Sequence, residues 1–245
     1  MIKNQNCVYC GITVKKSVNS DAGRSVEHLI PQIAVSKKRT NAKGDFNVCR
    51  KCNTEKSKID ELFGLLSRIN TPGEGGMEAI SKLAKMYGKR NKVITRMIDS
   101  ARSHPDGMEL KLPFKGEDIY KYGVFLTKGE YFKKHSSLLD LNEKVVLVTW
   151  GSPSLVKELL SRYQSTHGSN PYDDLVKNSS VENIYEECFI VANSEGDGFS
   201  FFFNREYLLL TKIVDKNEET VREKRINKLD LIAGFARGKA SKYCT

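Results

Sequence analysis

Residues 46–56 read FNVCRKCNTEK and contain the second of two C-x2-C pairs, Cys49 and Cys52. The first pair, Cys7 and Cys10, lies much earlier in the chain. Two such pairs supply the four thiolate ligands that tetrahedral Zn2+ prefers in structural sites. Because four protein ligands fill its coordination sphere, this zinc is expected to hold the fold and not to activate water. The alternative is that these cysteines form disulfides or remain bare thiols.

The segment between the two pairs carries a Glu-His dipeptide. Residues 25–31 read SVEHLIP, which places Glu27 directly before His28. Asn47 stands just before the second cysteine pair, and Asn53 follows it. This arrangement resembles the zinc-containing ββα-metal, or HNH, endonucleases. Their pattern is a C-x2-C pair, then Asp or Glu followed by His with Pro nearby, then Asn ahead of a second C-x2-C pair that is followed by Asn and Lys. The resemblance covers only residues 1–60.

The resemblance implies a role for each matching residue. His28 is the general base, Glu27 and Asn53 ligate a catalytic Mg2+ or Mn2+ ion, and Asn47 braces the loop behind the strand of His28. A neutral imidazole with a pKa near ~6.5 can accept a proton from water at cellular pH. Carboxylate and amide oxygens suit a hard cation that neutralises phosphate oxygens. Adjacent residues of a flat strand face opposite ways, so we expect a twist or bulge at Glu27–His28.

Two positions depart from the commonest family pattern. Asn53 stands where many members have His, a recognised HNN form that favours an amide oxygen at the metal. Glu27 replaces the commoner Asp, and its longer arm leaves direct and water-mediated ligation both open. Lys56, one helical turn beyond Asn53, is expected to contact the scissile or a neighbouring phosphate, with a solvated helix lysine as the alternative.

Basic residues exceed acidic ones in the chain as a whole. Forty Lys and Arg against thirty Asp and Glu give a formal net charge of +10, which attracts polyanions. The segment 36–44, SKKRTNAKG, contains Lys37, Lys38 and Arg39 and is expected to grip phosphates, with a solvated connector as the alternative. Nucleic acid is therefore the expected partner, and double-stranded DNA is favoured over single-stranded DNA or RNA.

The sequence gives no sign of membrane insertion or secretion. No apolar run approaches the ~20 residues of a spanning helix, and the opening MIKNQNCVYC lacks the apolar segment of a signal peptide. We therefore expect a cytoplasmic protein that does not bind membranes. The hydrophobic fraction of 39% and charged fraction of 29% are those of an ordinary globular chain.

Beyond residue 60, apolar periodicity predicts two helices, over 61–69 and 77–102, separated by the NTPGEGG segment at 70–76. Pro105 and Gly107 then suggest a boundary.

The second half of the chain predicts a mixed α and β body. The run KVVLVTW at 144–150 predicts a strand, followed by a helix with Ser152 as N-cap and Pro153 in its first position. Antiparallel strands are expected over 184–192, 199–203 and 207–214. The basic tail from Lys212 to Lys242 suggests a short closing helix.

Together these observations predict an α+β chain in three parts. Residues 1–60 form a zinc-stapled HNH (ββα-metal) module, 61–103 a helical connection, and 104–245 a mixed α/β domain for target recognition or assembly. The expected enzyme is a metal-dependent endonuclease that hydrolyses DNA phosphodiester bonds in restriction or defence against foreign or modified DNA. A phage or mobile-element nuclease is one alternative, and a non-catalytic zinc-ribbon-like nucleic-acid-binding protein is another. A homodimer is compatible with each of these functions.

Overall fold

The computed structural model describes residues 1–16, 20–35, 44–71, 73–105, 107–151, 153–169, 180–185, 188–192, 195–204 and 207–217. The basic segment predicted to grip phosphates, with Lys37, Lys38 and Arg39, lies outside the described residues. The same holds for Ser152 and for the tail after residue 217, where most of the closing helix is expected.

The N-terminal part consists of a two-stranded antiparallel sheet that leads directly into a long helix. β1 (Arg24–Glu27) pairs with β2 (Phe46–Cys49), and α1 (Arg50–Arg68) starts at the next residue. The short 3-10 helix η1 (Gln32–Ala34) packs on α1. The helix predicted from residue 61 therefore begins much earlier. Its cap is Cys49, whose Sγ accepts a hydrogen bond from the backbone N–H of Cys52 at 3.4 Å.

The predicted helix over 77–102 is wrong as a single element. The chain forms α2 (Glu74–Gly88) and α3 (Lys92–Asp99), and then a hairpin of β3 (Arg102–His104) and β4 (Gly107–Glu109). The break has a local cause. Arg90 adopts φ of 55°, and the Asn91 side chain caps α3 by accepting hydrogen bonds from the N–H groups of Val93 and Ile94.

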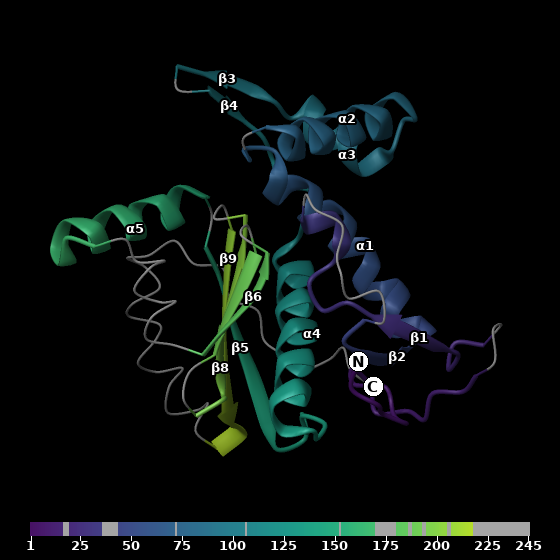
Figure 1. Cartoon of the computed structure of the whole chain (residues 1–245). Helices are drawn as coiled ribbons and strands as arrows, with labels where there is room; N and C mark the ends of the chain where they lie inside the picture. Colours follow the sequence, from purple (N-terminus) through teal and green to yellow (C-terminus); the bar gives the residue numbers. More distant parts are fainter. Residues whose placement is uncertain are drawn as a thin grey trace.

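Helix α4 (Gly116–His135), for which the sequence pattern gave no prediction, lies between the N-terminal part and the C-terminal sheet (Figure 1). Two glycines permit this close packing. A Cβ on Gly123 would lie 2.5 Å from a Val148 methyl, and one on Gly129 would lie 2.4 Å from a Leu29 methyl. Because α4 is buried on several faces, it lacks the single apolar stripe by which a surface helix is recognised.

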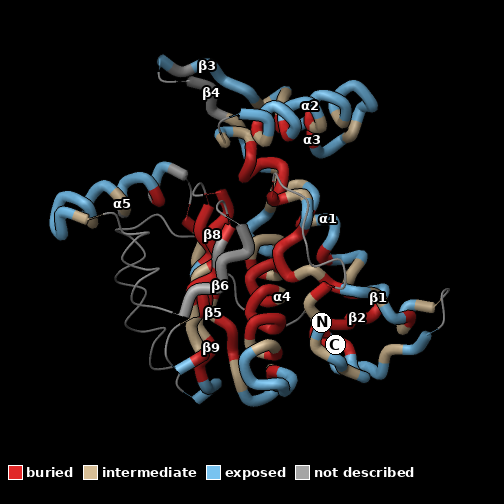
Figure 2. The backbone as a smooth tube through the Cα atoms, in the orientation of Figure 1, coloured by how far each residue is buried: buried red, intermediate tan, exposed pale blue. Residues whose placement is uncertain are grey.

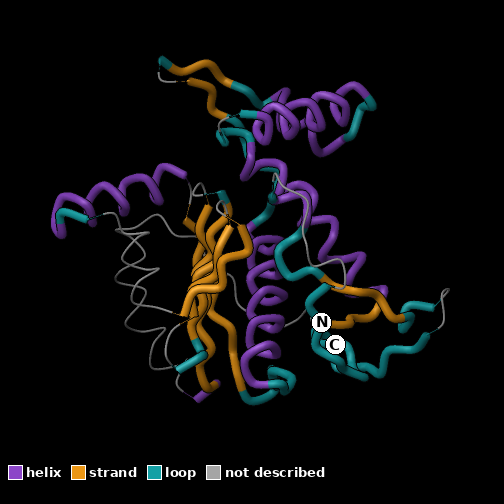
Figure 3. Tube along the Cα trace, viewed as in Figure 1, coloured by secondary structure: helices purple, strands orange, loops and turns teal. Residues whose placement is uncertain are grey.

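The C-terminal part is built on a five-stranded antiparallel sheet in the order β5-β9-β8-β7-β6. Its strands form one orange layer beside α4 (Figure 3). The strand predicted at 144–150 is confirmed as β5 (Lys144–Gly151), and α5 (Pro153–His167) begins at the predicted proline. β8 (Gly198–Phe203) and β9 (Tyr207–Asp215) also match their predictions, except that β9 includes the start of the basic tail. The strand expected over 184–192 is in fact part of two strands, β6 (Ser180–Tyr185) and β7 (Cys188–Ala192).

The largest apolar cluster runs from the N-terminal part through α4 into the sheet (Figure 2). Phe63 of α1 lies at the junction. Its ring centroid is 4.7 Å from that of Phe203 in β8 and 5.3 Å from that of Trp150 in β5. The turn after β8 adds a polar contact, because Asn204 donates a hydrogen bond to the backbone carbonyl of Ala34 at 2.9 Å. None of the described helices combines the length and apolar character needed to cross a bilayer.

Candidate metal centre and active site

The four cysteines of the two C-x2-C pairs converge in space. The sulfur atoms of Cys7, Cys10, Cys49 and Cys52 all lie within 4.8 Å of one another, and no disulfide joins them. The Sγ atoms of Cys10 and Cys49 are 3.7 Å apart. With Zn–S bonds of about 2.3 Å, sulfurs of a tetrahedral site stand ~3.8 Å apart, so the cluster fits a closed structural zinc site.

Local backbone geometry shapes both halves of this cluster. In the first pair the N–H of Gly11 donates to the carbonyl of Cys7 at 2.8 Å, and Gly11 takes φ of 79°, which glycine adopts without strain. The thiol of Cys52, hydrogen-bonded to Cys7, lowers the pKa of Cys7 to about 5. The second pair spans the end of β2 and the first turn of α1, so an ion held here fixes the start of α1.

His28 lies immediately after β1, at the point where the strand ends. The register of β1 and β2 is unbroken from Arg24 to Glu27, so no bulge interrupts the strand, and His28 follows its last residue. The imidazole Nδ1 is enclosed by protein, while the residue as a whole is half-buried.

Asn53 lies in the first turn of α1 and faces β1. Its Nδ2 donates a hydrogen bond to Oγ of Ser25 at 2.9 Å. The bond turns the amide nitrogen toward the strand, which leaves Oδ1 as the amide atom available to a cation. The contact between Asn53 and Ser25 therefore joins α1 to β1, and Ser25 lies two residues before Glu27 along the strand.

Glu27 and Lys56 form an ion pair inside the protein. The Nζ of Lys56 lies 2.9 Å from Oε1 of Glu27 and 2.9 Å from the carboxylate of Asp60, and it donates to the carbonyl of Leu29 at 3.0 Å. Lys56 is 0% exposed and Glu27 is 2% exposed. The prediction that Lys56 contacts a phosphate does not fit this placement, because its ammonium group is surrounded by protein acceptors. The solvated alternative does not fit either.

The ion pair extends to α4 and leaves one atom without a partner. Tyr122 of α4 donates a hydrogen bond from its hydroxyl to Oδ1 of Asp60 at 2.8 Å. The second oxygen of Glu27, Oε2, is buried, and among the residues that the structure describes no hydrogen-bond donor reaches it. Burial raises the pKa of Glu27 to about 7, against the opposing charge of Lys56. A buried oxygen of this kind is costly unless a proton or a cation satisfies it.

Asn47 and Asp45 lie on or beside β2 and hold the neighbouring chain. The backbone N–H of Asn47 donates to Oδ1 of Asn4 at 2.8 Å, and Asn4 donates back to the carbonyl of Asn47 at 2.7 Å. Asn47 therefore braces the N-terminal segment along β2. Asp45, which the sequence analysis missed, accepts a hydrogen bond from the N–H of Leu29 at 2.8 Å and so fixes the chain just after His28.

Asp60 and Tyr122 were also missed. The i,i+4 spacing of Lys56 and Asp60 on a helix is a signal that could have found the first of these. No sequence signal connects Tyr122 to the site.

Within the described parts of the chain, the four cysteines form the sole group of three or more His, Cys, Asp or Glu residues placed to hold a metal. A catalytic ion would therefore depend on few protein ligands, as Mg2+ often does.

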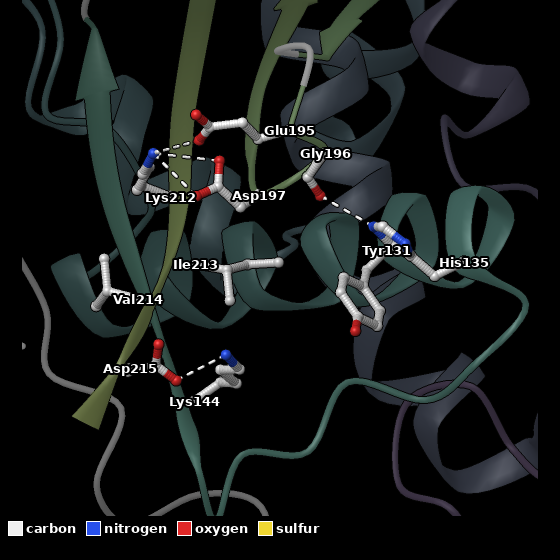
Figure 4. A pocket seen from close by; sticks show the side chains of 10 residues that line it. All are labelled: Tyr131, His135, Lys144, Glu195, Gly196, Asp197, Lys212, Ile213, Val214 and Asp215. Carbon is white, nitrogen blue, oxygen red and sulfur yellow. Dashed lines mark hydrogen bonds and ion pairs between the residues drawn. The ribbon is translucent and has the colours of Figure 1, made fainter. Parts of the chain in front are cut away.

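A separate hollow of about 350 Å3 lies between α4 and the C-terminal sheet (Figure 4). Both lysines in its wall are paired with carboxylates. Lys212 lies 2.9 Å from Asp197, and Lys144 lies 2.6 Å from Asp215. With its positive charges already matched, this hollow offers little net attraction to a phosphate.

Comparison with known proteins identified no matching family model, curated relative or solved structure.

Proposed function

We propose that this protein is a metal-dependent endonuclease that hydrolyses phosphodiester bonds of double-stranded DNA. The observation that carries the proposal is the hydrogen bond from Nδ2 of Asn53 on α1 to Oγ of Ser25 on β1, at 2.9 Å. This bond holds the start of the helix beside the strand that ends at Glu27, directly before His28. The order of antiparallel pair and helix, with the four-cysteine cluster at the start of the helix, supports it further. The resemblance of the sequence to HNH endonucleases supplies the reaction.

In this proposal His28 is the general base. Because Nδ1 is enclosed, Nε2 is the nitrogen that accepts the proton of the attacking water. Asp45 positions the chain next to His28 through its hydrogen bond to Leu29. Asn53 offers Oδ1 to a divalent ion, and Glu27 offers the buried Oε2 that lacks a donor. When bound, Mg2+ or Mn2+ neutralises the nonbridging and leaving oxygens of the phosphodiester.

Lys56 takes a different role from the one that its spacing suggests. Its ammonium group balances the negative charges of Glu27 and Asp60 in the buried interior. We therefore assign it to positioning the Glu27 carboxylate, and not to phosphate binding. Removal of one partner from such a buried pair leaves an uncompensated charge, so its effect reaches the site through Glu27.

One observation favours a second candidate, a non-catalytic zinc-containing nucleic-acid-binding protein. Glu27, which the nuclease reading assigns to the catalytic ion, already has Lys56 as an ion-pair partner. If the pair serves folding alone, the module would bind nucleic acid without cleaving it.

A metal screen on supercoiled plasmid separates the two candidates. The full chain, carrying its zinc, is incubated with Mg2+, Mn2+ or Ni2+, and nicked and linear products are measured. The nuclease predicts cleavage that requires an added divalent ion. Salt-sensitive binding with no cleavage in any of the three metals would establish the second candidate.

Asn53 variants test the proposed ligand directly. Asn53→Ala removes the amide oxygen and is expected to raise the Mg2+ or Mn2+ concentration needed for half-maximal cleavage. Asn53→Asp keeps an oxygen ligand and serves as the matched control. Equal metal dependence of the wild-type protein and Asn53→Ala would exclude Asn53 as a ligand. The role in restriction or defence, over a phage or mobile-element origin, rests on the resemblance alone, and cleavage of modified beside unmodified plasmid tests it.

A further inference from the structure

Helices α2 and α3 and the β3–β4 hairpin form a small unit beyond the end of α1 (Figure 1). The two helices are joined by Lys89, Arg90 and Asn91. The unit packs on the end of α1 through a second apolar cluster, in which Leu65 and Leu66 of α1 join the buried Ile94 and Met97 of α3. The outer side of the unit is largely exposed (Figure 2).

The connection between α2 and α3 borders a hollow of about 510 Å3 that is rich in positive charge. Arg90, Lys92 and Arg96 line it, together with Tyr87, and no carboxylate belongs to its wall. Within the described part of the chain, no carboxylate forms a salt bridge with any of these three cations. This is the reverse of the hollow beside α4, where both lysines are paired.

Other features of this surface favour a polar ligand. The hydroxyl of Thr95, in the wall of the hollow, is enclosed and has no hydrogen-bond partner within the described segments. On α3 the exposed side chains are Lys92, Val93, Arg96 and Asp99. Lys92 and Arg96 are one helical turn apart and share a face, which also carries Asp99 at the end of α3, while Val93 lies to one side of it. The opposite face of α3 carries the buried Ile94 and Met97, which pack in the apolar cluster and hold the helix in place.

We propose that α3 is a second DNA-binding element, which enters the major groove of a duplex with Arg90, Lys92 and Arg96 facing the DNA. A helix with its side chains is ~10–12 Å wide, and the major groove of B-DNA is ~12 Å wide. The deep, narrow major groove of duplex RNA does not admit a helix, so DNA is favoured. Arg90 and Lys92, at the start of α3, contact phosphates, and Arg96, further along, reaches base edges.

Helix α1 connects the candidate cleavage site to the unit that carries α3 (Figure 1). α1 carries Asn53 in its first turn and leads toward α2 at its other end (Figure 1). With 19 residues, α1 is ~28 Å long. One turn of B-DNA rises ~34 Å, so α1 is somewhat shorter than one turn of a duplex. The inference rests on the proposed function only for the choice of DNA as the polyanion.

The test measures binding without cleavage. The full chain, carrying its zinc and with no added divalent ion, is titrated against a labelled duplex of about two helical turns, and fluorescence anisotropy is followed at several KCl concentrations. The test variant is Arg90→Gln/Lys92→Gln/Arg96→Gln. The matched control, Lys157→Gln/Arg162→Gln/Lys216→Gln, removes the same charge from exposed positions on α5 and just after β9.

We expect the test variant to weaken binding roughly 100-fold and to reduce the salt slope by about 2 to 3, while the control changes affinity less than about threefold. Circular dichroism and zinc content check the fold. The single variant Arg96→Gln, expected to lose about tenfold, replaces the triple if that variant unfolds. Equal affinity of test and control variants would overturn the proposal, as would tighter binding of duplex RNA than of duplex DNA.

These outcomes are separate from the fate of the proposed function. Loss of binding in the test variant with no cleavage by the wild-type protein would retain the α3 surface and reject the nuclease. Metal-dependent cleavage by the wild-type protein, together with unchanged DNA binding by the test variant, would retain the nuclease and reject the α3 surface.

Discussion

The N-terminal module and the C-terminal sheet are stabilised in different ways, although one apolar cluster runs through both. The module has two short strands, a four-cysteine cluster and a buried group of charges around Lys56. The sheet has five strands, and the aromatic side chains of Phe199, Phe201 and Phe203 fill its core. A two-stranded sheet is marginal alone, so the module depends on its share of the apolar cluster and on its polar and cysteine side chains.

The difference teaches that a polar residue in the module can serve the fold as well as the chemistry. Lys56 is the clearest instance, because its spacing from Asn53 suggested a phosphate contact and its surroundings are entirely internal. In the sheet, by contrast, substitutions act through packing. The predictions below test this contrast from the largest expected effect to the smallest.

Loss of zinc should have the largest effect. We expect about one zinc ion per chain by metal analysis, and Cys49→Ser should lose it and destabilise the protein by ~5 kcal/mol or more, since structural zinc contributes directly to folding. Cys188→Ser is the matched control, because Cys188 is a buried cysteine outside the cluster. Equal zinc content and melting temperature in Cys49→Ser and the wild-type protein would refute the zinc site.

Phe63→Ala should follow, because it empties the junction between the module and the sheet. The ring of Phe63 packs against those of Tyr122, Trp150, Phe203 and Tyr207. We expect a loss of about 4 kcal/mol in the free energy of unfolding, measured by denaturant titration. Phe63→Leu, which keeps most of the volume, should lose much less. A cost below ~1 kcal/mol for the alanine variant would show that the two parts fold independently of this ring.

Lys56→Met should destabilise the protein by about 3 kcal/mol, because Glu27 and Asp60 then lie buried without their cation. The double variant Glu27→Gln/Lys56→Met should recover part of that loss. A phosphate-binding lysine behaves differently. If Lys56→Met retained wild-type stability while its DNA affinity fell, the positioning role would be wrong and the original prediction right.

Substitution of Glu78, in the second turn of α2, should change stability least, and the change should depend on pH. Lys82 and the buried Arg68 hold the pKa of Glu78 at about 2, below its ordinary value of 4.5. Because the folded pKa is lowered, this stabilisation is present above about pH 4.5 and is lost as pH falls toward 2. Glu78→Gln should cost less than about 1 kcal/mol near neutral pH. Melting temperatures of the two proteins should converge on acidification, and a constant difference would contradict the assignment.

The sequence predicted the cysteine cluster and several strands because those signals are local. Cys49 and Cys52 belong to a spaced pair, and the run at 144–150 is apolar and β-branched over the length of a strand. It missed α4 because burial on several faces erases the amphipathic pattern. The sequence pattern predicted one helix in place of α2 and α3, because Arg90 and Asn91 beside Gly88 are not strong helix breakers. Asn91 is nevertheless a good N-cap residue.

Within the candidate site, residue types were easier to predict than their surroundings. Asn53 faces β1, which agrees with its expected place in the first turn of a helix, but its role as a metal ligand stays a prediction. The burial of Lys56 could not be foreseen, since it depends on Tyr122 and Asp60, of which Tyr122 lies on α4, a distant part of the chain. Long-range contacts of this kind leave no trace in local spacing.

The most direct test of the account is the initial rate of metal-dependent plasmid cleavage by the wild-type protein and by His28→Ala. We predict that His28→Ala lowers the rate by about 10² to 10⁴-fold, because the general base is lost, while zinc content and melting temperature stay at wild-type values. Cleavage by His28→Ala at the wild-type rate, with the same metal requirement, would contradict the assignment of this site.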